Sequence, residues 1–285
     1  MISRIAPTPS GYLHMGNAYN FLLTWLYIRH HGGVLWLRLD DLDFRRCRPK
    51  YIEGIFRDLE WLGLEWNKGP TSVRDATQHS QHNRMNRYNE ILSILEDHEL
   101  TFGCSCSRKQ ILARSPDGRY PMTCRDKAPL GDKIWRFSFE KVNTLNILGM
   151  GECHPKKSVV VLRNREGFPS YQLACVVDDH DYGVNLIVRG ADLYGSSVIQ
   201  EILRSYLGFR RDILHIHHPL IMNSQGKKLS KSIASSPIAE LRAAGESVGR
   251  IYSDFARWLR WPKQPDTLEG LRLGFAQWEM SKQDQ

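Results

Sequence analysis

The first sixty residues alternate between short apolar runs and helical patterns, and this order limits the possible folds more than any other feature of the chain. Residues 2–6 form a short, mostly apolar run that stops at Pro7, which predicts a strand. Residues 15–31 repeat apolar side chains at helical spacing, and residues 34–39 return to an apolar run typical of a buried parallel strand. A second helical pattern covers residues 49–62. Strand, helix, strand and helix in this order predict an α/β fold built on a parallel sheet.

Size and charge narrow the class of protein. The chain has 285 residues, which favours two or three lobes over a single core. Its formal net charge of +8 indicates either a polyanionic partner, such as nucleic acid, or an ordinary solubility charge. No run approaches the roughly 18 apolar residues of a membrane helix, and the first residues lack the order of a secretory signal. We therefore expect a cytoplasmic protein with no membrane partner.

The turn between the first predicted strand and helix carries a candidate phosphate site. It contains Gly11, His14 and Gly16, followed by Asn17 at the start of the helix. A helix N-terminus presents backbone N–H groups and partial positive charge, which suit an anion. The two glycines allow a close approach of the backbone, and the imidazole can donate a hydrogen bond to a phosphoryl oxygen. Taken alone, this pattern also fits an ordinary strand-to-helix turn.

A second candidate lies far downstream, in the basic segment 226–232. It contains Lys227, Lys228 and Lys231 among Gly and Ser residues, so it combines flexibility with positive charge. Lysines in such a loop can neutralise charge on a triphosphate. A solvated surface turn is the alternative explanation for this segment by itself.

Together the two motifs resemble the signatures of the class I aminoacyl-tRNA synthetases, which bind ATP between them on a Rossmann-like sheet. The resemblance implies a role in catalysis for His14, Asn17, Lys228 and Lys231, and a role in binding ATP for Gly11, His14, Gly16, Asn17 and Lys231. Mg²⁺ would bridge the phosphates. Asn17 stands where the family usually has a second histidine, so this position keeps a donor but cannot become cationic.

Four further segments narrow the resemblance to the glutamyl branch of that family. They are residues 4–11, 38–43, 171–179 and 188–193, in the order that the branch has them. The implied glutamate-binding residues are Arg4, Ile5, Ala6, Pro7, Thr8, Asp40, Tyr171 and Arg189. An arginine can pair bidentately with the side-chain carboxylate, and Asp40 can accept a hydrogen bond from the α-ammonium group. The branch usually has Glu in place of Asp40, so this contact lengthens or passes through water, and another amino acid stays an alternative.

Three of the six cysteines lie close together in the sequence, at Cys104, Cys106 and Cys124. In a cytosolic chain this grouping indicates a soft-metal site and not disulfides. Zinc takes four ligands in a tetrahedron, and the resemblance to short glutamyl-type paralogues implies that Tyr120 is the fourth. Buried or non-ligating thiols are the alternative.

The resemblance also implies a division of the chain, on an α/β fold with an inserted subdomain and a short helical C-terminal region. The expected parts are the first half of the Rossmann-like domain (1–103), an inserted zinc-binding, acceptor-type subdomain (104–157), the second half (158–225), and the lysine loop with the helical C-terminal region (226–285). Only 54 residues follow Lys231, too few for another substantial core. In its length the chain resembles the truncated paralogues of the branch, which glutamylate queuosine in the anticodon loop of tRNA(Asp).

The expected partners are therefore glutamate and the tRNA(Asp) anticodon loop, bound by a monomer. Candidate phosphate contacts are Arg45, Arg46, Arg48, Lys50, Arg204, Arg210 and Arg211, whereas Trp258 and Trp261 are expected to pack in the interior. Three alternatives stay open: an adenylate-forming enzyme for another acid or acceptor, a catalytically silent RNA-binding relic, and a fragment of a longer synthetase.

Overall fold

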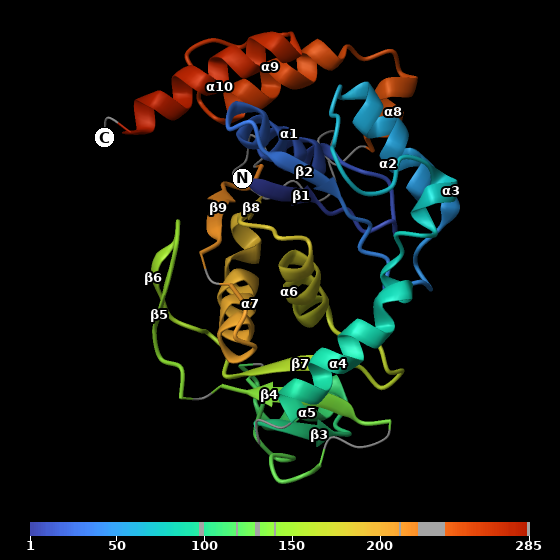
Figure 1. The fold of residues 1–285 in the computed structure, drawn as a ribbon, viewed down its shortest axis with the longest axis vertical. Helices are drawn as coiled ribbons and strands as arrows, with labels where there is room; N and C mark the ends of the chain where they lie inside the picture. The colour runs from blue at the N-terminus through green and yellow to red at the C-terminus, as the bar shows by residue number, and fades with distance from the viewer. Residues whose placement is uncertain are drawn as a thin grey trace. The chain divides into compact units, whose positions relative to one another are not determined.

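The computed structural model describes residues 1–96, 100–117, 119–128, 132–139, 141–210, 212–221 and 237–283. Its chain forms two compact units (Figure 1). The first unit comprises Met1–Gln81, Leu186–Ala191 and His217–Gln285, and the second comprises His82–Asn185 and Asp192–Ile216. The four-part division expected from the sequence stays a prediction.

The first unit contains the predicted parallel strand pair. Strands β1 (Ile2–Ile5) and β2 (Val34–Leu37) pair in parallel, with Ile2 opposite Val34, and helix α1 (Met15–His30) connects them. Strand β8 (Leu186–Gly190) lies beside β1, where the hydroxyl of Ser3 donates a hydrogen bond to the carbonyl of Leu186 at 2.8 Å. The parallel α/β fold predicted from the sequence is confirmed at its first crossover.

Further helices belong to the first unit. They are α2 (Pro49–Trp61), α3 (Val73–Ala76), α8 (Ile238–Ala243), α9 (Val248–Trp258) and α10 (Leu268–Gln283). Aromatic contacts stabilise the packing of the C-terminal helices. The ring centroids of Tyr27 on α1 and Phe275 on α10 are 4.8 Å apart, and those of Phe255 on α9 and Trp261 are 5.9 Å apart. Trp261 is only 4% exposed, and Trp258 contacts Tyr19, so the predicted packing role of both tryptophans is confirmed.

The second unit contains an antiparallel sheet in the order β3-β4-β7. Its strands are β3 (Thr101–Cys104), β4 (Ile134–Ser138) and β7 (Val159–Arg163), and a separate hairpin joins β5 (Leu145–Ile147) to β6 (Gly151–Cys153). Strand β7 pairs antiparallel with β4. A short apolar run reveals a buried strand but does not encode the direction of its partner.

Helices complete the second unit, together with the 3₁₀ turns η1 (Gln81–Arg84) and η2 (Ala191–Leu193), which lie at the junctions between the units. The helices are α4 (Met85–Glu96), α5 (Arg108–Arg114), α6 (Tyr171–Asp181) and α7 (Tyr194–Tyr206). Strand β9 (Leu214–His218) pairs with β8, and the chain passes from the second unit into the first within β9. No helix in the described part of the chain is long and apolar enough to cross a membrane.

The position of Arg204 corrects one sequence prediction. Its side chain on α7 is fully buried, with Nε 3.1 Å from a carboxylate oxygen of Glu201 and Nη2 3.5 Å from one of Asp179. The expectation that Arg204 contacts RNA phosphates is therefore wrong. Its charge neutralises buried carboxylates, because an unpaired buried charge would be too costly.

Candidate active site and cysteine cluster

His14 is the N-cap of helix α1. Its Nδ1 accepts a hydrogen bond from the backbone N–H of Gly16 at 3.1 Å, and Oδ1 of Asn17 accepts one from the backbone N–H of His14 at 3.0 Å. This reciprocal arrangement is a capping box. Because Nδ1 is an acceptor, Nε2 carries the proton of the neutral ring, and this N–H can donate to an anion. His14 is exposed, as a ligand-binding donor must be.

The two glycines of this turn have different surroundings. A Cβ added to Gly16 would lie 2.9 Å from Cε1 of His14, so glycine is required here for the imidazole to occupy its capping position. A Cβ added to Gly11 would meet no atom within 4 Å. The space over Gly11 is therefore open, as expected of a backbone that a ligand approaches.

The basic motif 226–232, with Lys228 and Lys231, lies outside the described residues, but its C-terminal flank is described. Pro237 forms a backbone bridge with His14, and the N–H of Ile238 donates to the carbonyl of Leu13 at 2.8 Å. The chain thus returns to the His14 turn six residues after Lys231.

The three charged residues among the predicted glutamate-binding residues lie in the first unit and are largely buried. Arg4 on β1 is 6% exposed, Arg189 on β8 is 4% exposed, and the side chain of Asp40 is 10% exposed after the end of β2. Backbone hydrogen bonds extend the β1–β2 pairing, because Arg38 N–H donates to the carbonyl of Ile5 and Asp40 N–H to that of Pro7. The segment with Ala6 and Thr8 therefore runs beside Asp40. Tyr171 is in the second unit, half exposed at the start of α6.

Sequence reasoning missed the partner of Asp40. Arg38 binds its carboxylate bidentately, with Nε 2.6 Å from Oδ1 and Nη2 3.3 Å from Oδ2, and Arg38 is only 2% exposed. The spacing carried a signal, because residues i and i+2 of an extended segment face the same side. Charge-assisted bidentate pairing fixes the direction of the carboxylate.

Asp41, the next residue, was also missed. Its Oδ2 accepts a hydrogen bond from the hydroxyl of Ser80 at 2.7 Å, and its Oδ1 accepts one from the backbone N–H of Gln81 at 2.8 Å. Asp40 and Asp41 therefore have different partners, since adjacent residues of an extended chain face opposite sides. The carboxylate of Asp41 holds the loop that follows α3.

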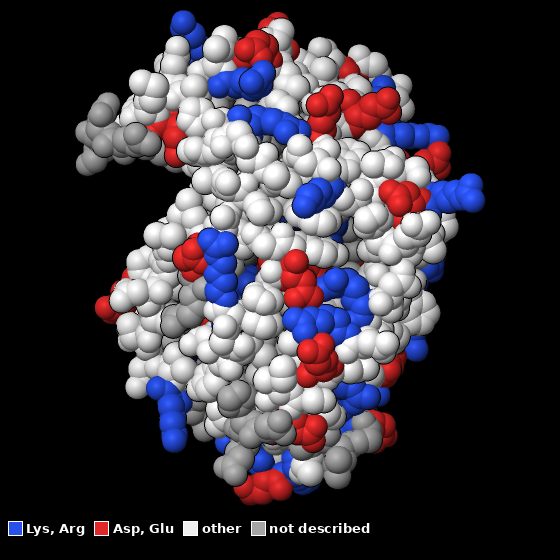
Figure 2. Space-filling model, in the orientation of Figure 1, with Lys and Arg blue, Asp and Glu red and all other residues white. Residues whose placement is uncertain are grey.

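The candidate phosphate contacts have mixed surroundings. Arg45, Arg46, Arg48 and Lys50 are exposed around the start of α2, as an RNA-binding role requires. Arg210 is exposed but forms an ion pair with Asp212, and Arg211 lies outside the described residues. On the face shown in Figure 2, basic and acidic side chains are interspersed. The excess positive charge is therefore not gathered into one continuous field on this face.

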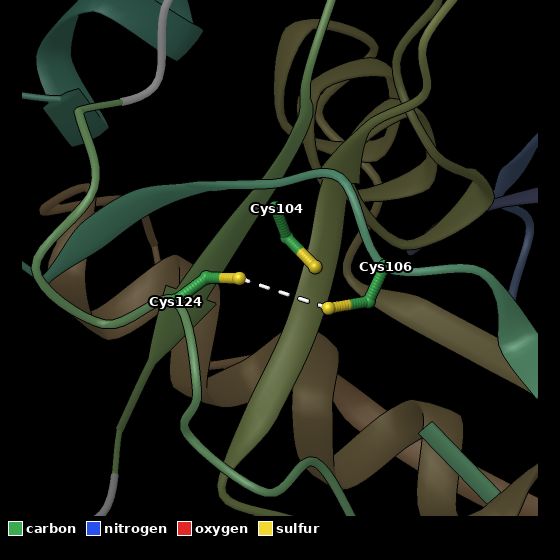
Figure 3. A group of neighbouring side chains, drawn as sticks. All are labelled: Cys104, Cys106 and Cys124. Carbon is green, nitrogen blue, oxygen red and sulfur yellow. Dashed lines mark hydrogen bonds between the residues drawn. The ribbon is translucent and has the colours of Figure 1, made fainter. Parts of the chain in front are cut away.

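The three predicted cysteine ligands converge in the second unit. Cys104 ends β3, and the sulfur atoms of Cys104, Cys106 and Cys124 point toward one another, all within 4.8 Å (Figure 3). The Sγ atoms of Cys106 and Cys124 are 3.7 Å apart. A tetrahedral zinc ion with Zn–S bonds of about 2.3 Å requires S···S separations of about 3.8 Å. The Cys106–Cys124 separation matches this value, and the three sulfur atoms are close enough together to share one zinc ion.

Tyr120, the predicted fourth ligand, lies beside the three cysteines. Its hydroxyl donates a hydrogen bond to Sγ of Cys104 at 3.1 Å, and its ring contacts Phe102. Burial raises the pKa of the Cys124 thiol, but hydrogen bonds from Tyr120 and Cys106 outweigh this effect and lower the pKa to about 7. Burial and the neighbouring thiols raise the pKa of Tyr120, so the phenol is protonated until a cation displaces its proton. The donor set fits zinc through three thiolates and one phenolate.

The parallel sheet with a capped turn at its first crossover defines the catalytic fold of a class I aminoacyl-tRNA synthetase. The family model for the catalytic domain of class I tRNA synthetases (E and Q) matches residues 1–126 and 141–246. The chain belongs to this family and is a ligase.

Relatives of similar length share much of its sequence. The glutamyl-Q tRNA(Asp) synthetase of Nitratidesulfovibrio vulgaris is 35% identical over 273 residues, which cover 87% of this chain and 83% of the relative. That of Deinococcus radiodurans is 36% identical over 276 residues, covering 91% of this chain and 89% of the relative. Both comparisons extend over nearly the whole of either protein.

Solved structures show the same fold in longer proteins. The glutamate tRNA ligase of Elizabethkingia meningosepticum has a TM-score of 0.66 at 23% identity over 81% of this chain, and glutamate-tRNA synthetase of Elizabethkingia anophelis has a TM-score of 0.69 at 23% identity over the same share. This chain spans only about half of each, 51% and 52%.

Proposed function

We propose that the protein activates glutamate with ATP and transfers it to the queuosine base in the anticodon loop of tRNA(Asp), as a cytoplasmic monomer. The observation that carries this proposal is the likeness to glutamyl-Q tRNA(Asp) synthetases over more than four fifths of both chains. The buried Arg4, Asp40 and Arg189 support glutamate as the amino acid, because they offer two cations and one anion to a dicarboxylic amino acid.

Glutamate binding follows from these charges. Arg4 or Arg189 would pair bidentately with the side-chain carboxylate, and Asp40 would accept a hydrogen bond from the α-ammonium group. Arg38 holds the Asp40 carboxylate in one direction, which compensates for its short side chain. The role of Tyr171, which belongs to the second unit, stays a prediction from the resemblance.

Adenylate formation needs no general base. The α-carboxylate of glutamate is already a nucleophile at neutral pH, and it attacks the α-phosphorus of ATP as pyrophosphate leaves. Nε2–H of His14 and the N-terminus of α1 would donate hydrogen bonds to phosphoryl oxygens, while Lys228 and Lys231 would neutralise their charge. The rate enhancement then comes from positioning and charge stabilisation.

Mg²⁺, when bound with ATP, would neutralise part of the negative charge on its phosphates. Within the described residues, the cysteine cluster is the only group of three or more His, Cys, Asp or Glu side chains placed to hold a metal. Zinc, held by the three cysteines and Tyr120, would be structural, because it has no open position when all four ligands bind.

Transfer uses the mixed anhydride. A hydroxyl of the queuosine cyclopentene ring attacks the activated carbonyl carbon of glutamate, and AMP leaves. The measurement that tests activation is exchange of labelled pyrophosphate into ATP, run without RNA over a panel of amino acids. We expect exchange with glutamate. No exchange with any proteinogenic acid would overturn the enzymatic proposal in favour of RNA binding alone.

A further inference from the structure

Arg136 is a buried cation in the antiparallel sheet of the second unit. It lies on β4, the middle strand, and is only 9% exposed. Among the described residues, its side chain forms no ion pair with a carboxylate, and its Nε has no hydrogen-bond partner. The buried Arg38 and Arg204, by contrast, both pair with carboxylates. Because a guanidinium buried without a counter-charge is costly, we expect an anion near Arg136.

The register of the sheet places Arg136 against Tyr120. Arg136 pairs with Phe102 of β3, so these two side chains extend from the same face of the sheet. The ring centroids of Phe102 and Tyr120 are 5.5 Å apart, and the guanidinium carbon of Arg136 is 4.4 Å from the centroid of the Tyr120 ring. The hydroxyl of this tyrosine donates its hydrogen bond to Sγ of Cys104. Arg136 therefore contacts the side chain that connects the sheet to the cysteine cluster.

The cysteine cluster supplies the missing anion when it holds zinc. Three thiolates outweigh the two positive charges of a zinc ion, so the loaded cluster has a net negative charge. A phenolate at the fourth position would add to it. The sulfur atoms of Cys104, Cys106 and Cys124 lie within 4.8 Å of one another, so this charge is concentrated beside Tyr120.

We propose that Arg136 is the counter-charge of the zinc-loaded cluster and that it positions Tyr120 as the fourth ligand. The guanidinium attracts the negative charge of the ligands, and its contact with the face of the ring restricts the rotation of the tyrosine side chain. Arg136 is thus a positioning residue, since it touches the tyrosine and not the metal. The proposal rests on the proposed zinc site, and it gives a role to a residue that the sequence did not single out.

The first test measures zinc affinity by competition with a chromophoric chelator in Arg136→Met, Arg136→Lys and Arg163→Met. Arg163 on β7 is the matched control, because its guanidinium carbon is 5.3 Å from the centroid of the Trp135 ring. Trp135 pairs with Gly103, so it extends from the sheet face opposite to that of Arg136. We expect Arg136→Met to bind zinc about tenfold more weakly, Arg136→Lys to lie between Arg136→Met and the wild type, and Arg163→Met to match the wild type.

Urea denaturation with and without zinc separates this role from simple packing. Without zinc, Arg136→Met should unfold with the same or a higher free energy than the wild type, since it removes a buried cation that has no carboxylate partner in the described part of the chain. At saturating zinc, the stabilisation by the metal should be about 1.4 kcal/mol smaller than in the wild type, which is the tenfold loss of affinity expressed as free energy.

A double-mutant cycle with Tyr120→Phe tests whether Arg136 acts through the tyrosine. The effect of Arg136→Met on zinc affinity should be smaller in the Tyr120→Phe background, because the phenol oxygen is absent. An undiminished effect would overturn the positioning of Tyr120.

Two further outcomes would overturn the proposal. Wild-type zinc affinity in Arg136→Met, with equal losses of stability in both states, would assign Arg136 to packing alone. A wild type that binds no zinc would remove the site and the role of Arg136 together. Glutamate-dependent pyrophosphate exchange, measured on the same samples, tests the proposed activity separately. A wild type without exchange whose zinc affinity still depends on Arg136 would contradict that activity and support the role of Arg136.

Discussion

The Nδ1 atom of His14 accepts a hydrogen bond from the backbone N–H of Gly16, 3.1 Å away, so the cap of α1 and the direction of the imidazole are set by one contact. The glycine is essential to it, since a Cβ at residue 16 would lie 2.9 Å from the imidazole carbon. The imidazole can rotate away from such a clash at little cost to the fold. Function and stability are therefore separable at this turn.

We predict that Gly16→Ala lowers adenylate formation by about 10²-fold, the size expected for losing one donor to the transition state, while the free energy of unfolding changes by less than about 1 kcal/mol. Pyrophosphate exchange and urea denaturation measure the two effects. Gly11→Ala is the matched control for stability, because its Cβ would meet nothing within 4 Å. If Gly16→Ala exchanges pyrophosphate at the wild-type rate, His14 does not bind the phosphates of ATP.

Arg38 should control the affinity for glutamate through Asp40. In Arg38→Gln the carboxylate loses a bidentate partner, so we expect the KM for glutamate to rise about tenfold while the KM for ATP stays near its wild-type value. The Arg38→Lys variant keeps the charge but makes fewer hydrogen bonds, so its KM for glutamate should lie between those of the wild type and Arg38→Gln. Thermal unfolding checks that each variant is folded. Equal increases in both KM values would show a general disturbance of the site.

Much of this site follows from sequence, and the remainder has identifiable physical reasons. The crossover β1–α1–β2 and the cap at His14 are local, so apolar spacing and the His-x-Gly-Asn pattern predict them well. Arg204 was misassigned because charge alone does not reveal that Asp179 and Glu201 surround it. The direction of β7 depends on pairing with β4, which a single strand does not encode. Arg38 was overlooked since its partner lies two residues away and its function is indirect.

A pH-dependent contribution to stability is expected from Asp58. Its side chain on α2 is fully buried and pairs with Arg242 of α8 at 3.1 Å. Burial raises its pKa to about 6, and Arg242 only partly opposes this effect. Because the folded pKa lies above the unfolded value of about 3.9, the unfolded state releases this proton first, and stability falls as pH rises from about 4 to 6.

The variant Asp58→Asn isolates this contribution. Between pH 4 and pH 7, the unfolding free energy of the wild type should fall by up to about 3 kcal/mol relative to that of Asp58→Asn. Urea denaturation at several pH values measures it. A difference that stays constant over this range would show that folding leaves the pKa of Asp58 unchanged.

Metal content tests the cysteine cluster. Protein purified without chelator should contain one equivalent of zinc by elemental mass spectrometry, and Cys124→Ser should lose nearly all of it. Tyr120→Phe keeps the ring against Phe102 but lacks the phenol oxygen. We expect this variant to bind zinc and to release it to a chelator more readily than wild type, since water can fill the fourth position. A zinc content below about 0.2 equivalents in the wild type would show that the thiols pack in the interior without binding zinc.

The acceptor is tested by an isolated tRNA(Asp) anticodon stem-loop that carries queuosine. If glutamate is attached to the modified base, this fragment should accept labelled glutamate in the presence of ATP. The same stem-loop with guanosine should not, because it lacks the cyclopentene hydroxyls that attack the mixed anhydride. Accepting and non-accepting stem-loops have the same phosphates, so both should bind with a similar steep salt dependence. Glutamate appearing on the 3′-terminal adenosine of full-length tRNA would instead assign the protein to ordinary tRNA charging.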